Sequence, residues 1–310
     1  MSTSKTPATA IYALFGPTGV GKTEVAVALA ERLRARGEEP VAVSADALQV
    51  YAGLETLTGV AAPRQQARLQ HRLVSFLPLD ASFSVGEYAR LAHAEIDGLL
   101  AAGRRPIVVG GTGLYLRAAL AELDLRPPPA PEARARWDAE LRRRGAPALH
   151  ELLARRAPWA GQEIEPNDSH RLVRALELLD AGALSPPAAA SQLWSDELRH
   201  PTLLAGLTME REALYARIDA RVEEMLRAGV RAQVRHAHLS GASDTARQAL
   251  GFPELLADDV EAMKRHTRNY ARRQLTWMRK LAGVCVIDVT ERDPDEVAAL
   301  VLASGQAPPA

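Results

Sequence analysis

The chain has 310 residues, of which 47% are hydrophobic and 25% are charged. This composition is that of an ordinary globular protein, long enough for a buried core and a second domain or a large insertion. Lysine plus arginine and aspartate plus glutamate balance at 38 each. The net charge therefore does not indicate a nucleic-acid binder, although it does not exclude local basic patches.

A single cysteine, Cys285, excludes an internal disulfide framework and a cysteine-based zinc site. Because it lies in the apolar run Val284–Ile287, we expect it to be buried. Residues 1–9 lack the apolar stretch of a signal peptide, and no uncharged apolar run reaches the ~20 residues that span a membrane. The sequence therefore predicts a soluble, monomeric, cytoplasmic protein without a membrane partner.

The first part of the chain alternates apolar strands with amphipathic helices. The expected order is a strand at Ala10–Phe15, a helix at Thr23–Arg36, a strand at Val41–Ser44, a helix at Tyr88–Ala102 and a strand at Pro106–Val109. Gly37 and Gly103 stand where the two helices should end. This alternation predicts an α/β fold with a parallel sheet flanked by helices.

The pattern changes after the proline-rich segment Leu125–Pro131, which cannot continue a helix. Residues 132–192 show helical patterns without a strong strand. A strand at Leu203–Leu207, helices at Arg211–Ala228 and Lys264–Lys280, and a last strand at Val284–Val289 follow. We therefore expect a core in two parts, residues 1–124 and 201–310, interrupted by a mostly helical insertion domain at residues 125–200.

The segment after the first strand matches the Gly-x-x-x-x-Gly-Lys-Ser/Thr pattern of a phosphate-binding loop (P-loop), as in ATP-binding and other nucleotide-binding proteins. Its glycines let consecutive backbone N–H groups point at a phosphate, and the following helix adds its positive end. Lys22 supplies a charge, and the Thr23 hydroxyl is a candidate Mg²⁺ ligand. The pattern predicts diphosphate or triphosphate binding by Gly16, Pro17, Thr18, Gly19, Val20, Gly21, Lys22 and Thr23.

A carboxylate follows the second strand rather than the third, which runs into Gly110 and Gly111. Strand ends on one side of a parallel sheet border the ligand crevice, so Asp46 should lie near the phosphate-binding loop. We interpret Asp46 as a base or a metal ligand. The competing interpretation is a helix cap for the residues from Ala47 onward.

Segments spread in order over nearly the whole chain resemble the tRNA dimethylallyltransferase (tRNA isopentenyltransferase) family. They are Gly16–Thr23, Ser44–Tyr51, His71–Val74 with Phe83–Val85, Val108–Tyr115, Pro166–Glu177, Arg247–Phe252 and Tyr270–Trp277. One such segment is weak evidence, whereas their ordered combination is highly specific. The resemblance implies a P-loop NTPase-like parallel sheet with flanking helices and a helical insertion domain that binds tRNA.

The resemblance implies transfer of a dimethylallyl group from dimethylallyl diphosphate to N6 of adenosine 37, with release of pyrophosphate. This adenosine lies beside the anticodon of tRNAs that read codons beginning with U. The phosphate-binding loop would hold the donor diphosphate rather than ATP, with Mg²⁺ as cofactor and Thr23 as its ligand. Catalytic roles fall to Asp46 as the base and to Thr23 and Arg217 at the departing pyrophosphate. The competing interpretation of Arg217 is a solvated helix face.

The implied partner is the anticodon stem-loop of tRNA, whose target base must leave its stack. The residues that match contact segments are Asp46, Ala47, Leu48, Gln49, Thr112, Arg134, His170, Arg171, Leu172, Val173, Arg174, Arg247, Gln248, Ala249, Leu250, Gly251 and Phe252. Basic residues between His266 and Lys280 either suit a phosphate backbone or form a solvated face. Arg171 and Arg174 share a helix face, where they either grip RNA or pair with Asp168 and Glu177.

The chain departs from the family pattern after Tyr51. Segment Gly53–Pro63 is two residues longer than the family's Gly-Met-Asp-Ile-Gly-Thr-Ala-Lys-Pro and contains no lysine. Ser75 stands where the family often has aspartate. These departures leave the phosphate-binding loop and Asp46 intact, and the role of the missing lysine is either lost or supplied by an arginine.

Three other functions compete with this one. They are a small-molecule P-loop kinase, a prenyltransferase acting on free adenine nucleotides, and an RNA-binding module without catalysis. ATP consumption would mark the kinase. The helical insertion and the basic C-terminal region favour RNA over a free nucleotide, and Asp46 beside an intact loop argues against the module.

Overall fold

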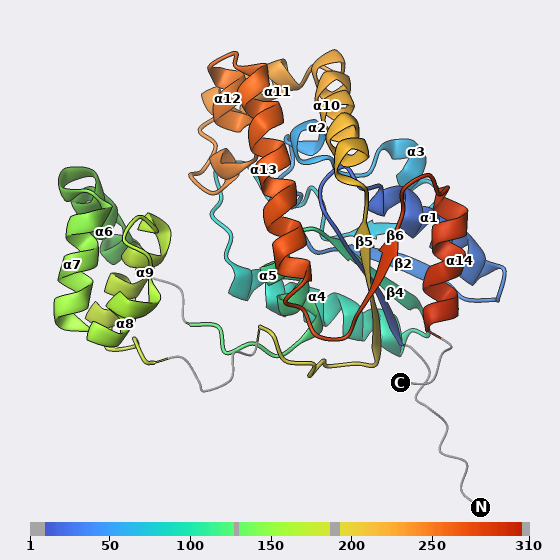
Figure 1. The fold of residues 1–310 in the computed structure, drawn as a ribbon, viewed down its shortest axis with the longest axis horizontal. Helices are drawn as coiled ribbons and strands as arrows, with labels where there is room; N and C mark the ends of the chain where they lie inside the picture. The colour runs from blue at the N-terminus through green and yellow to red at the C-terminus, as the bar shows by residue number, and fades with distance from the viewer. Residues whose placement is uncertain (1–9, 127–129, 187–192, 306–310) are drawn as a thin grey trace, which may run out of the picture. The chain divides into compact units, whose positions relative to one another are not determined.

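The computed structural model describes residues 10–126, 130–186 and 193–305. Contacts within the chain divide it into two compact units. We call Met1–Leu123 together with Leu193–Ala310 the core unit, and Asp124–Gln192 the helical unit (Figure 1).

The chain re-enters the core unit earlier than residue 201, the expected boundary. The backbone N–H of Arg199 donates to the carbonyl of Leu120, at 2.9 Å. The Arg199 guanidinium also pairs with Asp97 at 2.9 Å and with Glu122 at 2.7 Å. These contacts fasten the returning segment beside the point where the chain leaves the core.

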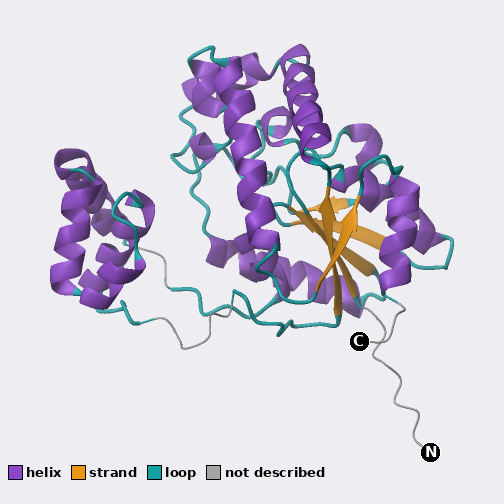
Figure 2. Ribbon diagram, in the orientation of Figure 1, coloured by secondary structure: helices purple, strands orange, loops and turns teal. Residues whose placement is uncertain are grey.

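The core unit is built on a six-stranded sheet with the order β3–β2–β4–β1–β5–β6, and all neighbouring strands are parallel (Figure 2). All residues of β1 and β2 are buried, as expected for a parallel sheet covered on both faces. The α/β fold is therefore confirmed. The strands are β1 (Ile11–Phe15), β2 (Pro40–Ser44), β3 (His71–Arg72), β4 (Arg105–Gly110), β5 (Thr202–Thr208) and β6 (Val284–Asp288).

The two edge strands differ most from what the sequence predicts. β3 was not expected, because its two residues are too few to give a periodic pattern. The expectation that Cys285 is buried was wrong, since this residue in β6 is half-buried and the neighbouring Val286 is 60% exposed. β6 pairs with β5 alone, so one edge of this apolar strand faces solvent.

Helices cover the two faces of the sheet. Helices α1 (Lys22–Arg34) and α14 (Pro294–Ser304) pack together against the face that carries Tyr12, Leu14 and Ile107. Helices α4 (Val85–Ala101) and α5 (Gly113–Leu120) lie on the opposite side (Figure 1). Helix α4 begins at Val85, where Ser84 and Glu87 form a capping box.

A further group of helices has its own apolar core, centred on Tyr51, Val222 and Phe252. The longest, α13, begins at Val260 rather than at Lys264, because Asp259 caps it by accepting from the Ala262 N–H at 2.8 Å. The group consists of α2 (Glu55–Thr58), α10 (Arg211–Arg227), α11 (Val230–Leu239), the 3₁₀ helix η1 (Ala246–Gln248), α12 (Phe252–Leu256) and α13 (Val260–Met278), with α3 (Pro63–Gln66) beside α1. None of the described helices is both long and apolar enough to cross a membrane.

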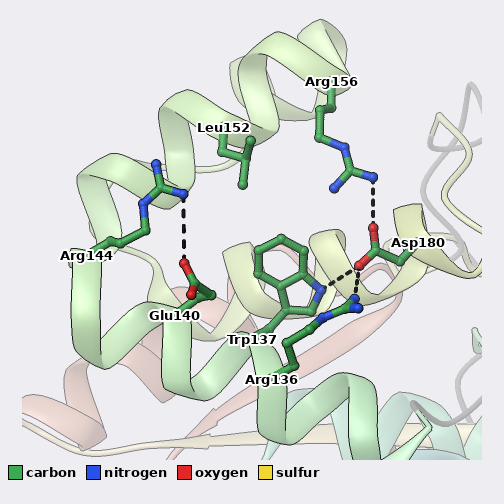
Figure 3. A pocket seen from close by; sticks show the side chains of 7 residues that line it. All are labelled: Arg136, Trp137, Glu140, Arg144, Leu152, Arg156 and Asp180. Carbon is green, nitrogen blue, oxygen red and sulfur yellow. Dashed lines mark hydrogen bonds and ion pairs between the residues drawn. The ribbon is translucent and has the colours of Figure 1, made fainter.

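The helical unit contains α6 (Pro131–Arg144), α7 (Ala146–Arg156), α8 (Pro158–Glu163) and α9 (Ser169–Asp180), and its described residues form no strand. Leu149, Leu153 and Leu176 are fully buried at its centre. Three arginines line a pocket beside Trp137, and each pairs with one of two carboxylates, Asp180 or Glu140 (Figure 3). Asp180 accepts from Arg136, from Arg156 at 2.8 Å and from the Trp137 indole at 2.8 Å, and Glu140 pairs with Arg144 at 3.8 Å.

Gly110, at the end of β4, offers a test of how tightly strand ends pack. A Cβ there would lie 2.2 Å from the carbonyl oxygen of Ala45, a backbone atom that cannot move away cheaply. We expect Gly110→Ala to lower the free energy of unfolding by about 1–3 kcal/mol, as overpacking does, measured by urea denaturation. Gly98→Ala in α4 is the matched control, because no atom lies within 4 Å of its added Cβ and alanine favours a helix. Equal stability of the two variants would contradict this account.

Candidate active site

The phosphate-binding loop, Gly16–Thr23, follows β1 directly. Gly19 and Gly21 have φ values of 83° and 99°, in the left-handed region that favours glycine. A Cβ on Gly19 would also lie 2.9 Å from the Ile218 side chain. Helix α1 then begins at Lys22 without a side-chain cap, so the backbone N–H groups of its first turn remain for an anion.

Lys22 is the cation of this loop. Its Nζ donates to the carbonyl oxygens of Gly16 and Pro17, at 2.8 and 2.9 Å. Burial, followed by the neighbouring charge of Arg221, lowers the pKa of Lys22 to about 7, although Asp46 and Glu24 oppose the shift. A bound anion would favour the protonated amine, so Lys22 would become positively charged when the loop binds a phosphate.

Asp46 lies beyond the end of β2 and uses its two oxygens differently. Oδ1 accepts from the backbone N–H groups of Leu48 at 3.0 Å and Gln49 at 3.4 Å. Oδ2 faces the Thr112 hydroxyl at 3.5 Å. The capping interpretation is therefore correct for one oxygen, although the capped segment is a turn and not a helix. The second oxygen remains available for chemistry.

Thr112 and Tyr270 extend this polar group from two other elements. Thr112 stands between β4 and α5, and its hydroxyl lies 3.3 Å from the Tyr270 hydroxyl of α13. Burial, followed by the charge of Asp46, raises the pKa of Tyr270 to about 12. Tyr270 is therefore a neutral hydrogen-bonding group at ordinary pH.

Helix α10 brings two arginines to the loop. Arg217 Nη2 lies 3.3 Å from the position of a Cβ added to Gly21, which places the predicted arginine beside the phosphate-binding loop. Arg221 follows one helical turn later, and its Nη2 would lie only 1.6 Å from a Cβ on Gly59. Burial lowers the pKa of Arg221. Neither guanidinium has a hydrogen bond or an ion pair with the residues described here.

One cavity of about 1150 Å³ joins these groups. Small-molecule sites are typically ~300–1,000 Å³, so it has room for more than one small ligand. Ala62, where the family lysine is missing, lines it together with Arg64. The other lining residues that matter here are Lys22, Thr23, Asp46, Ala47, Leu48, Gln49, Thr112, Arg217, Arg221, Gln248, Leu250, Tyr270, Arg273 and Gln274.

Other residues predicted to contact RNA serve the packing of the core unit. Phe252 and Ala249 are 1% exposed within the apolar core around Tyr51, and Gly251 is buried with φ of 95°. Arg247 donates to the Ala242 carbonyl at 2.7 Å and lies 2.9 Å from a nitrogen of His238. Of this segment, Gln248 and Leu250 reach the cavity.

The remaining predicted RNA contacts belong to the helical unit. Leu172 and Val173 are buried in its core, so their side chains have no surface to offer RNA. Arg134 and Arg174 both pair with the buried Glu177, at 2.9 and 3.2 Å. Arg171 lies 3.7 Å from Asp168, and His170 is exposed. Arg171 and Arg174 therefore have the acidic partners that the pairing alternative names, and their contact with RNA stays a prediction.

The basic helix α13 is partly neutralised in the same way. His266 contacts Glu254 at 2.6 Å, and Arg268 contacts Asp219 at 2.7 Å. Arg273 instead lines the cavity, with its guanidinium 5.5 Å from the centre of the Tyr270 ring. The helix therefore presents fewer uncompensated charges than its sequence suggests.

Three site residues were not predicted: Arg221, Tyr270 and Gln274. Arg221 could have been found, because it lies one turn after Arg217 and therefore on the same face of α10. Tyr270 and Gln274 lie in a segment that resembles the family, but nothing local marks which of its side chains turn inward. Their partners are distant in sequence, with Gln274 contacting Thr18 across 256 residues.

Comparison with known proteins gives one consistent family. A model described as IPP transferase matches residues 49–281, and one described as isopentenyl transferase matches residues 9–77. A tRNA dimethylallyltransferase of Thermobifida fusca is 39% identical over 87% of each chain. One of Bacillus licheniformis is 36% identical over 94% of this chain and 93% of that protein.

Solved structures agree with the sequence relatives. The full-length tRNA isopentenylpyrophosphate transferase of Bacillus halodurans has a TM-score of 0.67 and 31% identity, and the match covers 96% of both chains. A eukaryotic dimethylallyltransferase solved acting on tRNA shares the fold, with a TM-score of 0.72 at 20% identity. These matches extend over most of the chain and confirm the resemblance predicted from the sequence. The chain therefore belongs to the IPP transferase family of prenyltransferases.

Proposed function

We propose that this protein transfers a dimethylallyl group from dimethylallyl diphosphate to N6 of adenosine 37 of tRNAs that read codons beginning with U. The observation that carries the proposal is the shared cavity. Lys22 and Thr23 line it from the phosphate-binding loop after β1, and Asp46 lines it from the end of β2, two strands away in the sheet. A diphosphate donor and a purine acceptor can therefore meet in one cavity.

The residues suggest how the bonds change. The N6 amine attacks the allylic carbon, the bond from that carbon to the diphosphate oxygen breaks, and pyrophosphate leaves. Asp46 Oδ2 takes the N6 proton, since Oδ1 is already bound to backbone N–H groups. Lys22, Arg217 and Arg221 stabilise the charge that grows on the departing pyrophosphate.

The site residues fit Mg²⁺ as a companion of the diphosphate. Thr23 lines the cavity, and its hydroxyl has no hydrogen-bond partner among the residues that the structure describes. The described residues also contain no group of three histidine, cysteine, aspartate or glutamate side chains suited to a metal. Mg²⁺ commonly binds through few protein ligands together with substrate phosphates, so Thr23 would hold it, and it would help neutralise the leaving pyrophosphate.

The target base would reach the cavity by leaving its stack in the anticodon loop. Gln248, Leu250 and Arg273 line the cavity from α13 and the segment before α12, where they would meet the base or its phosphate. We propose that the helical unit contributes further RNA contacts. We also propose that the protein acts as a monomer in the cytoplasm.

The experiment is a transfer assay with purified protein. Radiolabelled dimethylallyl diphosphate is mixed with an anticodon stem-loop carrying adenosine 37, and the label retained on RNA is counted. We expect label on this RNA but none when guanosine replaces the target adenosine. Free adenosine monophosphate as sole acceptor tests the free-nucleotide alternative, and ATP consumption tests the kinase. A protein that consumes ATP and leaves the RNA unlabelled would refute the proposal.

The pKa of Lys22 predicts how pyrophosphate affinity depends on pH. Because the amine of the free protein loses its proton as pH rises through about 7, affinity should fall between about pH 6 and 9. The titration of pyrophosphate itself also contributes, so Lys22→Arg is the control, since a guanidinium keeps its charge. Calorimetric Kd values should rise more steeply with pH for the wild type than for Lys22→Arg. Parallel pH profiles would show that Lys22 does not titrate there.

A further inference from the structure

Gln274 of α13 joins two loops of the candidate active site. Its Oε1 accepts from the Thr18 backbone N–H in the phosphate-binding loop, at 2.8 Å. Its Nε2 donates to the Gly111 carbonyl in the turn after β4, also at 2.8 Å. The side chain is 5% exposed. One amide group thus connects the loop that would hold the donor to the turn that carries Thr112.

The fit around Gln274 leaves little space. A Cβ added to Gly111 would lie 2.3 Å from Gln274 Nε2 and 3.0 Å from the Gly16 carbonyl oxygen. Gly111 therefore lets the turn approach both the amide and the phosphate-binding loop. A shorter side chain at position 274 could not reach both backbone groups, and an apolar one would leave the part-buried Thr18 N–H and the buried Gly111 carbonyl unsatisfied.

Each polar atom of Gln274 binds one backbone group, so the amide is held on both sides. The same helix presents Tyr270 to Thr112, at 3.3 Å, and Thr112 faces Asp46. Helix α13 therefore contacts the donor side through Gln274 and the acceptor side through Tyr270. Its position sets the distance between the two sides.

We propose that Gln274 is a positioning residue that fixes the phosphate-binding loop relative to Thr112 and Asp46. It acts through the backbone groups of Thr18 and Gly111 that it holds. The inference rests on the proposed function. Its consequence is kinetic, because a misplacement of ~1 Å between reacting groups can slow an enzyme about 100-fold.

The test compares Gln274→Met, which keeps the length but removes both hydrogen bonds, with Ser84→Ala. Ser84 caps α4 outside the cavity, so its loss lowers stability without touching the site. We expect Gln274→Met to lower kcat about 100-fold while Kd for the anticodon stem-loop changes less than about twofold. Ser84→Ala should keep the kcat of the wild type at a temperature where both variants are folded.

Gln274→Glu separates the two hydrogen bonds. A glutamate oxygen can still accept from Thr18, but the second oxygen would face the Gly111 carbonyl without a donor, so kcat should fall here as well. A kcat within about threefold of the wild type in both variants would overturn the proposal, as would a loss that Ser84→Ala reproduces.

Hydrogen exchange of the Thr18 amide in the wild type needs no variant and keeps the proposal testable if the substitutions prevent folding. We expect this N–H to be protected. Exchange at the rate of an unstructured amide would overturn the proposal that Gln274 holds the phosphate-binding loop. Failure of the proposed function is distinguishable, because it would leave the stem-loop unlabelled by the wild type while the Thr18 amide stays protected.

Discussion

Asp46→Asn should lower kcat for dimethylallyl transfer about 10²–10⁴-fold, the range that general-base catalysis contributes. The asparagine oxygen can still accept from Leu48 and Gln49, as Asp46 Oδ1 does, so the turn should survive. What is lost is the negative charge on the oxygen that faces Thr112. Single-turnover transfer to the stem-loop measures the chemical step, and calorimetry with pyrophosphate should give a Kd close to that of the wild type.

Asp46→Ala is the companion variant, because it removes the cap as well as the charge. We expect it to lose activity like Asp46→Asn and to be less stable by about 0.5–1.5 kcal/mol, the net contribution of a hydrogen bond to stability. If Asp46→Asn retained the wild-type rate, Asp46 would be a turn residue only, and the base would have to be sought elsewhere in the cavity.

Arg221→Met should weaken pyrophosphate binding by about 2–5 kcal/mol, the usual cost of removing one buried partner of a charge pair. That corresponds to at least ~30-fold in Kd. The same substitution should raise stability, because burial lowers the pKa of Arg221 and methionine removes that unfavourable burial of charge. The two effects have opposite signs, which a general loss of structure cannot imitate.

Arg211→Met at the start of the same helix is the matched control. Arg211 is exposed and does not line the cavity, so the change removes an equal charge outside the site. Calorimetry and urea denaturation should show little change in this control. An Arg221→Met protein that binds pyrophosphate normally, or that is less stable than the wild type, would contradict the role assigned to Arg221.

The parts of the site that the sequence predicts are those encoded locally. The phosphate-binding loop is contiguous, with glycines at the two left-handed positions, Gly19 and Gly21, so its spacing alone indicates an anion site. Asp46 required one further step, the rule that parallel strands end at a common edge. Thr112 was named only through the family resemblance, and it lies beside Asp46 because it follows β4, the neighbour of β2.

The residues that sequence reasoning misjudged depend on which way a side chain points. Leu172, Val173 and Phe252 were assigned to RNA contact because they lie within matching segments, yet all are buried. Their apolar character was the available signal, since helices bury such residues at a regular spacing. Gln274 gave no comparable signal, because its two partners are backbone groups of distant segments.

The hydrogen bond between Arg199 and Leu120 has a consequence for how this architecture varies. It joins the segment that leaves the core unit to the segment that returns to it, so the residues between them form a loop whose two ends are already held together. The entropic cost of bringing the two ends of a loop together grows only slowly with the number of residues in the loop. The helical unit can therefore change in length at little cost to the stability of the core unit.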